Sequence, residues 1–154
     1  MPVEIERKFL VVGESWRGLG HIVPIRQGYL ASSESLSVRV RQAGPHAFLT
    51  VKGGAGLVRA EYEYEIPLDE AVEMLDRLCH PPLIEKRRHV LDLDGIEWVV
   101  DEFDGALSGL VLAEVELDSA EQQVDLPGWV GREVTDDPRY LNASLAKDGL
   151  PREA

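Results

Sequence analysis

Several features that would point to a particular class of protein are scarce or missing in this 154-residue chain. Its one cysteine, Cys79, excludes an intramolecular disulfide and any metal site built from several cysteines. No stretch approaches the roughly 18 consecutive apolar residues that a membrane-spanning helix needs, and the first residues do not resemble a signal peptide. These absences predict a soluble, cytoplasmic protein with no membrane partner.

Positive charge is also scarce. The chain has 16 Lys and Arg residues against 28 Asp and Glu residues, which gives a formal net charge of −12 at pH 7. Non-specific binding to nucleic acid requires a basic surface, so no nucleic-acid partner is expected. The same net charge would repel a small polyanion unless cations or a bound metal reverse its sign locally.

The main pattern in the chain is an alternation of apolar and polar residues in many short runs, which is typical of a β-sandwich or a β-barrel. Eight strands are expected, over residues 3–12, 22–30, 35–42, 48–52, 59–66, 84–93, 96–103 and 110–117. Glycines predict turns at residues 53–56 and 94–95. Neither a long linker nor an internal repeat divides the chain, so residues 1–154 are expected to form a single domain.

Three segments depart from this alternation. Residues 69–79 carry apolar side chains at helical spacing, and residues 119–122 match a capping box that would start a short helical turn. Asp137 and Pro138 are typical of the start of a helix, here expected over residues 139–147. The apolar faces of these helices need a surface to cover, so we expect helices packed on the outside of the strands.

Ionisable side chains recur at every second position of the expected strands. Residues two apart lie on the same face of a strand, so each group shares one surface and the apolar residues share the other. The acidic members are Glu4, Glu6, Glu61, Glu63, Asp101, Glu114 and Glu116, and the basic members are Lys8, Arg39, Arg41, Lys52, Lys86 and Arg88. Asp101 is followed by a further acid, Glu102, and the alternation favours Asp101 as the residue on the charged face.

Two purely structural explanations compete with a functional one. Antiparallel strands commonly turn charged side chains to water, and exposed cross-strand ion pairs each stabilise a sheet by only about 0–1 kcal/mol. Neither explanation requires paired acids and paired bases to recur on separate strands. The functional interpretation is a closed eight-stranded antiparallel barrel whose charged faces line a hydrated interior, which can hold one small ligand.

Such an interior would suit a chain of phosphoryl groups. Arginine binds phosphate oxygens through two parallel hydrogen bonds, and lysine acts as a point charge. Carboxylates are the ligands that Mg²⁺ or Mn²⁺ takes together with phosphate oxygens. A divalent metal between carboxylates and phosphates turns their repulsion into attraction, which makes an acidic protein compatible with an anionic substrate.

The motifs on these strands resemble those of the CYTH, or triphosphate tunnel metalloenzyme, superfamily, in its compact bacterial form. Glu4-Ile5-Glu6-Arg7-Lys8 matches the ExExK opening of that family, and the other motifs follow in order over residues 3–147. They are Gln27-Gly28-Tyr29-Leu30, Val38-Arg39-Val40-Arg41, Thr50-Val51-Lys52-Gly53, Glu61-Tyr62-Glu63, Lys86-Arg87-Arg88, Asp101-Glu102-Phe103 and Glu114-Val115-Glu116. The resemblance implies an α+β, mainly β fold, with an eight-stranded antiparallel tunnel and helices outside it.

The resemblance also implies roles for individual residues. Phosphate binding falls on Lys8, Arg39, Arg41, Lys52, Lys86, Arg88 and Lys147, the last on a C-terminal helix that folds over one tunnel mouth. Metal binding, of Mg²⁺ or Mn²⁺, falls on Glu4, Glu6, Glu61, Glu63, Asp101, Glu114 and Glu116. Catalytic roles fall on Lys8, Tyr29, Lys86, Glu61 and Glu63.

The expected reaction is metal-dependent hydrolysis of inorganic triphosphate to pyrophosphate and phosphate. One metal would be held mainly by Glu4, Glu114 and Glu116, and a second, near Glu61 and Glu63, would activate water. The alternatives are an adenylyl cyclase of class IV type, another nucleotide or thiamine triphosphatase, and a non-catalytic polyphosphate-binding module. No set of residues specifies adenine, and the chain keeps both the cations and the carboxylates. The oligomeric state is left open, and a homodimer is compatible with the sequence.

Overall fold

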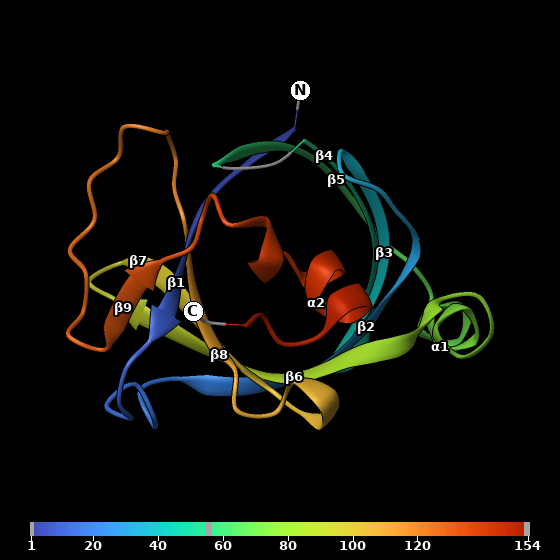
Figure 1. Ribbon diagram of the computed structural model, residues 1–154, viewed down its shortest axis with the longest axis horizontal. Helices are drawn as coiled ribbons and strands as arrows, with labels where there is room; N and C mark the ends of the chain where they lie inside the picture. Colours follow the sequence, from blue (N-terminus) through green and yellow to red (C-terminus); the bar gives the residue numbers. More distant parts are fainter. Residues whose placement is uncertain (1, 55–56, 153–154) are drawn as a thin grey trace.

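The computed structural model describes residues 2–54 and 57–152 (Figure 1). The strands are β1 (Val3–Val11), β2 (His21–Ser32), β3 (Leu36–Ala43), β4 (His46–Gly53), β5 (Val58–Glu65), β6 (His80–Leu93), β7 (Ile96–Phe103), β8 (Val111–Glu116) and β9 (Val130–Glu133). The α-helices are α1 (Leu68–Arg77) and α2 (Asn142–Asp148), and the 3₁₀ helices are η1 (Gly105–Leu107) and η2 (Pro138–Tyr140). None of the helices in the described ranges is long and apolar enough to cross a membrane.

Eight of the strands close into an antiparallel barrel. Their order around it is β5-β4-β3-β2-β6-β7-β8-β1, and β1 pairs again with β5 through Val3 and Ala60 to close the ring. Figure 1 looks along this ring, with β9 added against β1 on the outside. The predicted mainly β fold and its eight strands are therefore confirmed.

Buried apolar side chains form three separate clusters, two outside the barrel wall and one inside it. The first outer cluster contains Phe9, Trp98 and Trp129, and the second lies under α1. Trp98 and Trp129 meet edge to face with their ring centres 5.6 Å apart. The inner cluster contains Leu112, which lies opposite Asp101 and so shares its inward face, and it is covered by α2. Over the rest of the barrel the apolar residues pack outside, and the charged residues of the same strands face the interior.

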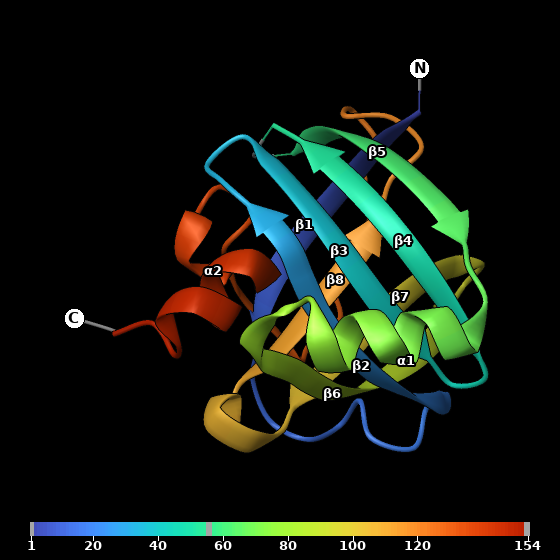
Figure 2. The ribbon, with the colours of Figure 1, turned by 90° about the vertical axis from the view of Figure 1, so that its right-hand side faces the viewer.

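The two α-helices cover different parts of the barrel. Helix α1 packs against β3 and β4 on the outer wall and buries Ala71 and Leu75 (Figure 2). Helix α2 contacts β6 and β2; it lies within the outline of the ring in Figure 1 and beyond the strands in Figure 2. Together the views place α2 over one mouth of the barrel, where it buries Leu145.

The segments outside the barrel differ most from the prediction. The helix expected over residues 139–147 is divided into η2 and α2 by the extended backbone of Leu141, although Asp137 does cap its start by accepting a hydrogen bond from the Arg139 amide. Residues 119–122 form one hydrogen-bonded turn, from Gln122 N to Ser119 O, and no helix. Strand β9, with four residues, was missed because so short a segment shows no alternation.

Turns and strand ends show smaller differences. Strand β6 starts four residues earlier than expected and includes Pro81 and Pro82. Because its pairing with β7 begins only at Lys86, these prolines lie on a free strand edge, where a missing amide proton is tolerated. The turn at Asp94 and Gly95 is confirmed, with φ of 55° and 82°. In the turn predicted over residues 53–56, residues 55 and 56 lie outside the described residues.

Candidate active site

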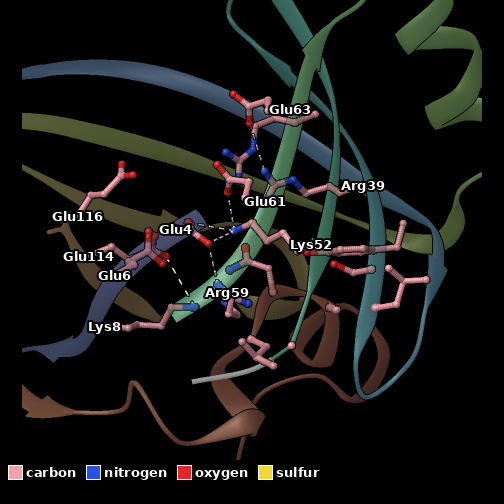
Figure 3. A pocket seen from close by; sticks show the side chains of 18 of the residues that line it. Glu4, Glu6, Lys8, Arg39, Lys52, Arg59, Glu61, Glu63, Glu114 and Glu116 are labelled. Carbon is pink, nitrogen blue, oxygen red and sulfur yellow. Dashed lines mark hydrogen bonds and ion pairs between the residues drawn. The ribbon is translucent and has the colours of Figure 1, made fainter. Parts of the chain in front are cut away.

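A cavity of about 240 Å³ lies inside the barrel and is lined mainly by charged side chains (Figure 3). Apart from Glu34, which lies between β2 and β3, its charged and aromatic lining residues are Glu4, Glu6, Lys8, Tyr29, Arg39, Arg41, Lys52, Arg59, Glu61, Glu63, Arg88, Glu114 and Glu116. They come from seven of the eight barrel strands, and Leu141, Asn142 and Ala143 close the lining at the start of α2. The structure thus brings together most of the residues that the sequence singled out.

The register of the strands explains why opposite charges meet across the cavity wall. Residues directly opposite in an antiparallel pair point to the same face of the sheet. Lys8 lies opposite Glu114, and Lys52 lies opposite Glu61. Their charged groups approach to 3.8 Å and 3.4 Å, respectively.

Glu4 is a carboxylate of the cavity lining that contacts two cations. Its carboxylate lies 2.8 Å from Lys52 Nζ and 3.2 Å from an Arg59 nitrogen, and Figure 3 shows the three side chains together. Burial raises the pKa of Glu4, but Lys52 and Arg59 outweigh it and leave this pKa below its usual value. Glu4 is therefore ionised and paired inside the tunnel.

Glu6 and Glu114 are crowded carboxylates with opposite pKa shifts. Burial, followed by the nearby charges of Glu114 and Glu4, raises the pKa of Glu6 well above its usual value. Burial also acts to raise the pKa of Glu114, but Lys8 and Arg88 outweigh it and leave this pKa well below its usual value. Crowded carboxylates of this kind are a place where a divalent cation could bind.

Two arginines of β3 carry positive charge that the protein does not fully compensate. Arg39 donates to Thr50 Oγ1 at 3.3 Å, and its Nε is the one buried side-chain nitrogen or oxygen in the described residues that has no hydrogen-bond partner. Burial, with the neighbouring Arg39 and Arg88, lowers the pKa of Arg41 to about 9. Like charges crowded beside an unpaired donor are the features of a site that binds an anion.

Tyr29 lies beside these arginines. The side chain is buried and lines the cavity. Burial raises the pKa of its phenol and outweighs the opposing effect of Arg39 and Arg41. The hydroxyl therefore keeps its proton and can donate a hydrogen bond.

Lys86 and Asp101 face inward as predicted but do not line the cavity. Lys86 Nζ lies 2.8 Å from Asp101 Oδ2 and donates to Asn142 Oδ1 at 2.9 Å. Asp101 also accepts two hydrogen bonds of 2.9 Å from Arg88. Burial, aided by Arg88 and Arg41, lowers the pKa of Lys86 to about 7.

Asp101 is already paired with neighbouring cations, which distinguishes it from a carboxylate that is free to bind a metal. Burial acts to raise its pKa, but Arg88 and Lys86 outweigh it and hold this pKa at about 2. Both carboxylate oxygens are engaged by these two cations. The neighbouring Glu102 points out of the barrel, as the alternation predicted, and binds Arg17 and His89.

Lys147 is not brought to the cavity. It is exposed on α2 and borders a separate groove, together with Pro82 and Leu107. The placement of Lys147 among the phosphate-binding residues is corrected here, because the face of α2 that meets the cavity is its first turn and Lys147 lies in its last.

Two lining residues were missed in the sequence. Arg59 shares its strand face with Glu61 and Glu63, so the alternation that identified those acids would also have found Arg59. Asn142 lies on a helix, and no pattern in the sequence singles it out.

The carboxylates fit a hard divalent cation by their chemistry. In the part of the chain that the structure describes, no three acidic, histidine or cysteine side chains already converge on one point that could hold a metal. Burial, followed by the charges of Glu114 and Glu4, nevertheless raises the pKa of Glu6, and oxygen ligands of this kind suit Mg²⁺ or Mn²⁺.

Fold and site together define a barrel protein whose charged tunnel can bind a polyanion. The chain belongs to the CYTH domain family, whose model matches residues 2–149. It is 49% identical over 149 residues to an inorganic triphosphatase of Acetivibrio thermocellus, with 96% of each chain covered. It is 44% identical over 147 residues to an inorganic triphosphatase of Nitrosomonas europaea, covering 93% of this chain and 96% of that one.

A solved structure agrees with these sequence comparisons. The crystal structure of the inorganic triphosphatase NE1496 is 42% identical, covers 99% of both chains and superimposes with a TM-score of 0.69. The predicted family is confirmed over nearly the whole chain, and membership implies a divalent metal and a small triphosphate as substrate.

Proposed function

We propose that this protein is an inorganic triphosphatase that hydrolyses triphosphate to pyrophosphate and phosphate with Mg²⁺ or Mn²⁺. The observation that carries the proposal is the group of buried cations around the cavity, in which Arg39 Nε has no partner and Arg41 is crowded by like charges. Such a group suits an anionic ligand, and the relatives named inorganic triphosphatase support a triphosphate as that anion.

The phosphates would be bound by Lys8, Arg39, Arg41, Lys52 and Arg88, with Arg59 as an addition to the predicted set. Lys8 and Lys52 now contact carboxylates, and these weak or exchangeable pairs would give way to phosphate oxygens. Phosphoryl transfer depends mainly on positioning and on stabilising developing charge, and a fixed set of cations supplies both.

The metal would be held by Glu4, Glu6, Glu114 and Glu116, and Glu61 with Glu63 would hold or orient a second ion or its water. When bound, a divalent metal neutralises phosphate oxygens and lowers the pKa of a coordinated water. Asp101 would act indirectly, by holding Lys86 and Arg88 in place.

Two further residues would assist the reaction. The protonated Tyr29 hydroxyl would donate a hydrogen bond to a phosphate oxygen. Lys86 has a pKa of about 7, so Lys86 Nζ can take up or release a proton near neutral pH, which an ordinary lysine cannot do.

The shape of the cavity favours a small inorganic substrate over a nucleotide. Among the described residues its lining is mostly charged or polar, and its one aromatic side chain, Tyr29, lies beside Arg39 and Arg41. Helix α2 covers one mouth of the barrel. The cyclase and the binding module predicted as alternatives gain no support from this geometry.

A substrate panel tests the function. We expect phosphate release from triphosphate with Mg²⁺ or Mn²⁺, and little from ATP, thiamine triphosphate or pyrophosphate. Arg39→Ala and Glu114→Ala should each lower kcat/KM by about 100-fold, the scale of one lost stabilising group in an active site. Lys147→Ala, a lysine outside the cavity, is the matched control and should keep full activity.

Equal rates in the wild type, Arg39→Ala and Glu114→Ala would refute the proposal, and cyclic AMP formed from ATP would replace it with the cyclase. A single domain, a homodimer and a cytoplasmic location stay predictions from the sequence.

A further inference from the structure

Asn142 occupies an unusual place for the first residue of a helix. Asparagine commonly caps a helix through its side chain, but the cap residue of α2 is Leu141 and no side chain caps this helix. The Asn142 side chain instead reaches into the barrel, where the residue lines the cavity. Its Oδ1 accepts hydrogen bonds of 2.9 Å from both Lys86 Nζ and Gln27 Nε2.

The hydrogen bonds of Asn142 connect Arg41 and Lys86, which lie on β3 and β6, the two strands that flank β2. Gln27 is fully buried, and its Oε1 accepts a 2.7 Å hydrogen bond from Arg41 Nε on β3. Lys86, on β6, meets Asp101 with its other short contact. A chain of hydrogen bonds therefore runs from Arg41 through Gln27 and Asn142 to Lys86, and Asn142 is its single member outside the barrel strands.

The chain segment just before Asn142 also binds a cation through a neutral oxygen. Lys8 Nζ donates to the Tyr140 carbonyl at 3.0 Å, two residues before Asn142. The segment over this mouth of the barrel thus supplies one neutral oxygen each to Lys8 and Lys86.

The neutrality of this acceptor matters. Asp101 fixes Lys86 and Arg88 but also cancels one of their two charges. An amide oxygen fixes a cation in place and leaves its full charge for an anion. Catalysis by fixed charges requires such orientation before the substrate arrives, since a cation that must reorganise during the reaction stabilises the transition state less.

We propose that Asn142 is a positioning residue for the triphosphatase reaction, acting through its hydrogen bonds to Lys86 and, by way of Gln27, to Arg41. This inference rests on the proposed function. Asn142 holds the two cations at the covered end of the tunnel in the geometry that the transition state needs.

Two substitutions separate the roles of shape, acceptor and charge. Asn142→Leu keeps the approximate size and removes the acceptor, whereas Asn142→Asp keeps an acceptor oxygen and adds negative charge beside Lys86. Ser144→Ala, two residues further along α2 and outside the cavity lining, is the control for effects on the helix. Release of phosphate from inorganic triphosphate is measured with Mn²⁺, and kcat is expressed per folded molecule, with the folded fraction taken from urea unfolding.

We expect Asn142→Leu to lower kcat by about 10- to 100-fold and to change KM by less than about threefold, because small misplacement of fixed groups affects the transition state most. Asn142→Asp should retain a kcat closer to the wild type and raise KM, since its charge repels triphosphate. Ser144→Ala should match the wild type. This crossed pattern of kcat and KM cannot arise from loss of folded protein alone.

A kcat of Asn142→Leu within about twofold of an active wild type would overturn the inference and leave the proposed function intact. The same holds if Asn142→Asp loses as much kcat as Asn142→Leu. A wild type that releases no phosphate from triphosphate would overturn the proposed function and this inference together.

Discussion

The two faces of the β6–β7 pair carry similar interactions with different consequences. Inside the barrel, Asp101 bridges Lys86 and Arg88. One position further along β7 and on the outside, Glu102 accepts a 2.7 Å contact from His89 and two 2.9 Å hydrogen bonds from Arg17. Both carboxylates are buried; Asp101 is held by two basic groups, and Glu102 by three, the third being Arg87 at 3.6 Å.

The two faces differ in the residues that surround each carboxylate and its basic partners. The outer group is closed by Trp16, whose ring packs edge-on against His89 at 4.8 Å, so it fastens the loop between β1 and β2 to the wall. The inner group adjoins Arg41, which is crowded by further cations. Crowding of like charges around Arg41, and not the presence of ion pairs, therefore distinguishes the inner face from the outer one.

The largest effect should come from removing the inner carboxylate. Asp101→Ala leaves two buried cations without their shared partner, and breaking a buried pair in this way costs about 3–5 kcal/mol. Glu102→Ala on the outer face should cost about 1–3 kcal/mol, because Arg17 is partly exposed and regains water. Urea unfolding of both variants measures the difference.

A loss for Glu102→Ala equal to or above that for Asp101→Ala would contradict this ranking of the two faces. Asp101→Asn serves as the control for shape, since it keeps the volume and removes the charge.

The barrel and its charged lining could be predicted because alternation is a local property of each strand. Once residues such as Glu4 and Glu6 are placed on one face, closure of the sheet brings them together with Arg39 without further information. The same alternation correctly predicted that Asp101 faces the interior of the barrel and that Glu102 faces outward. The alternation also predicts an inward-facing side chain at Arg59, which lines the cavity.

The residues that alternation could not place lie on the C-terminal segment. The extended backbone at Leu141 turns the first residue of α2, and not its last turn, toward the cavity. Asn142 is therefore at the site and Lys147 is outside it, and nothing local in the sequence determines that rotation. Tertiary packing of α2 against β6 and β2 sets it.

A smaller effect should be a pH dependence of the free energy of unfolding that arises from Lys86 on the inner face. The pKa of Lys86 is about 7 in the folded protein because of burial, with Arg88 and Arg41 adding to it, against a usual value of 10.5. Between these two pH values the unfolded chain binds more protons, so the free energy of unfolding should rise as the pH increases from about 7 to 10. The rise should reach at least about 1.4 kcal/mol, the equivalent of one pKa unit.

Lys86→Met should flatten this part of the profile, and Arg87→Met, at the next and outward-facing position, should preserve it. Unfolding measured in urea at several pH values checks both. A rise that survives in Lys86→Met would assign it to another group and contradict the role given to burial.

The smallest expected effect is the stabilisation of the folded protein by metal alone. Ligands that bind only the folded state stabilise it by an amount that grows with concentration, about 1.4 kcal/mol at ten times Kd. For a chain of this size that is a rise in Tm of about 3–6 °C in Mn²⁺. Glu114→Gln should abolish the rise, because Glu114 lies in the inner carboxylate group, and Glu133→Gln on the outside should retain it. Equal shifts in both variants would place metal binding on the outer surface and remove the tunnel carboxylates from that role.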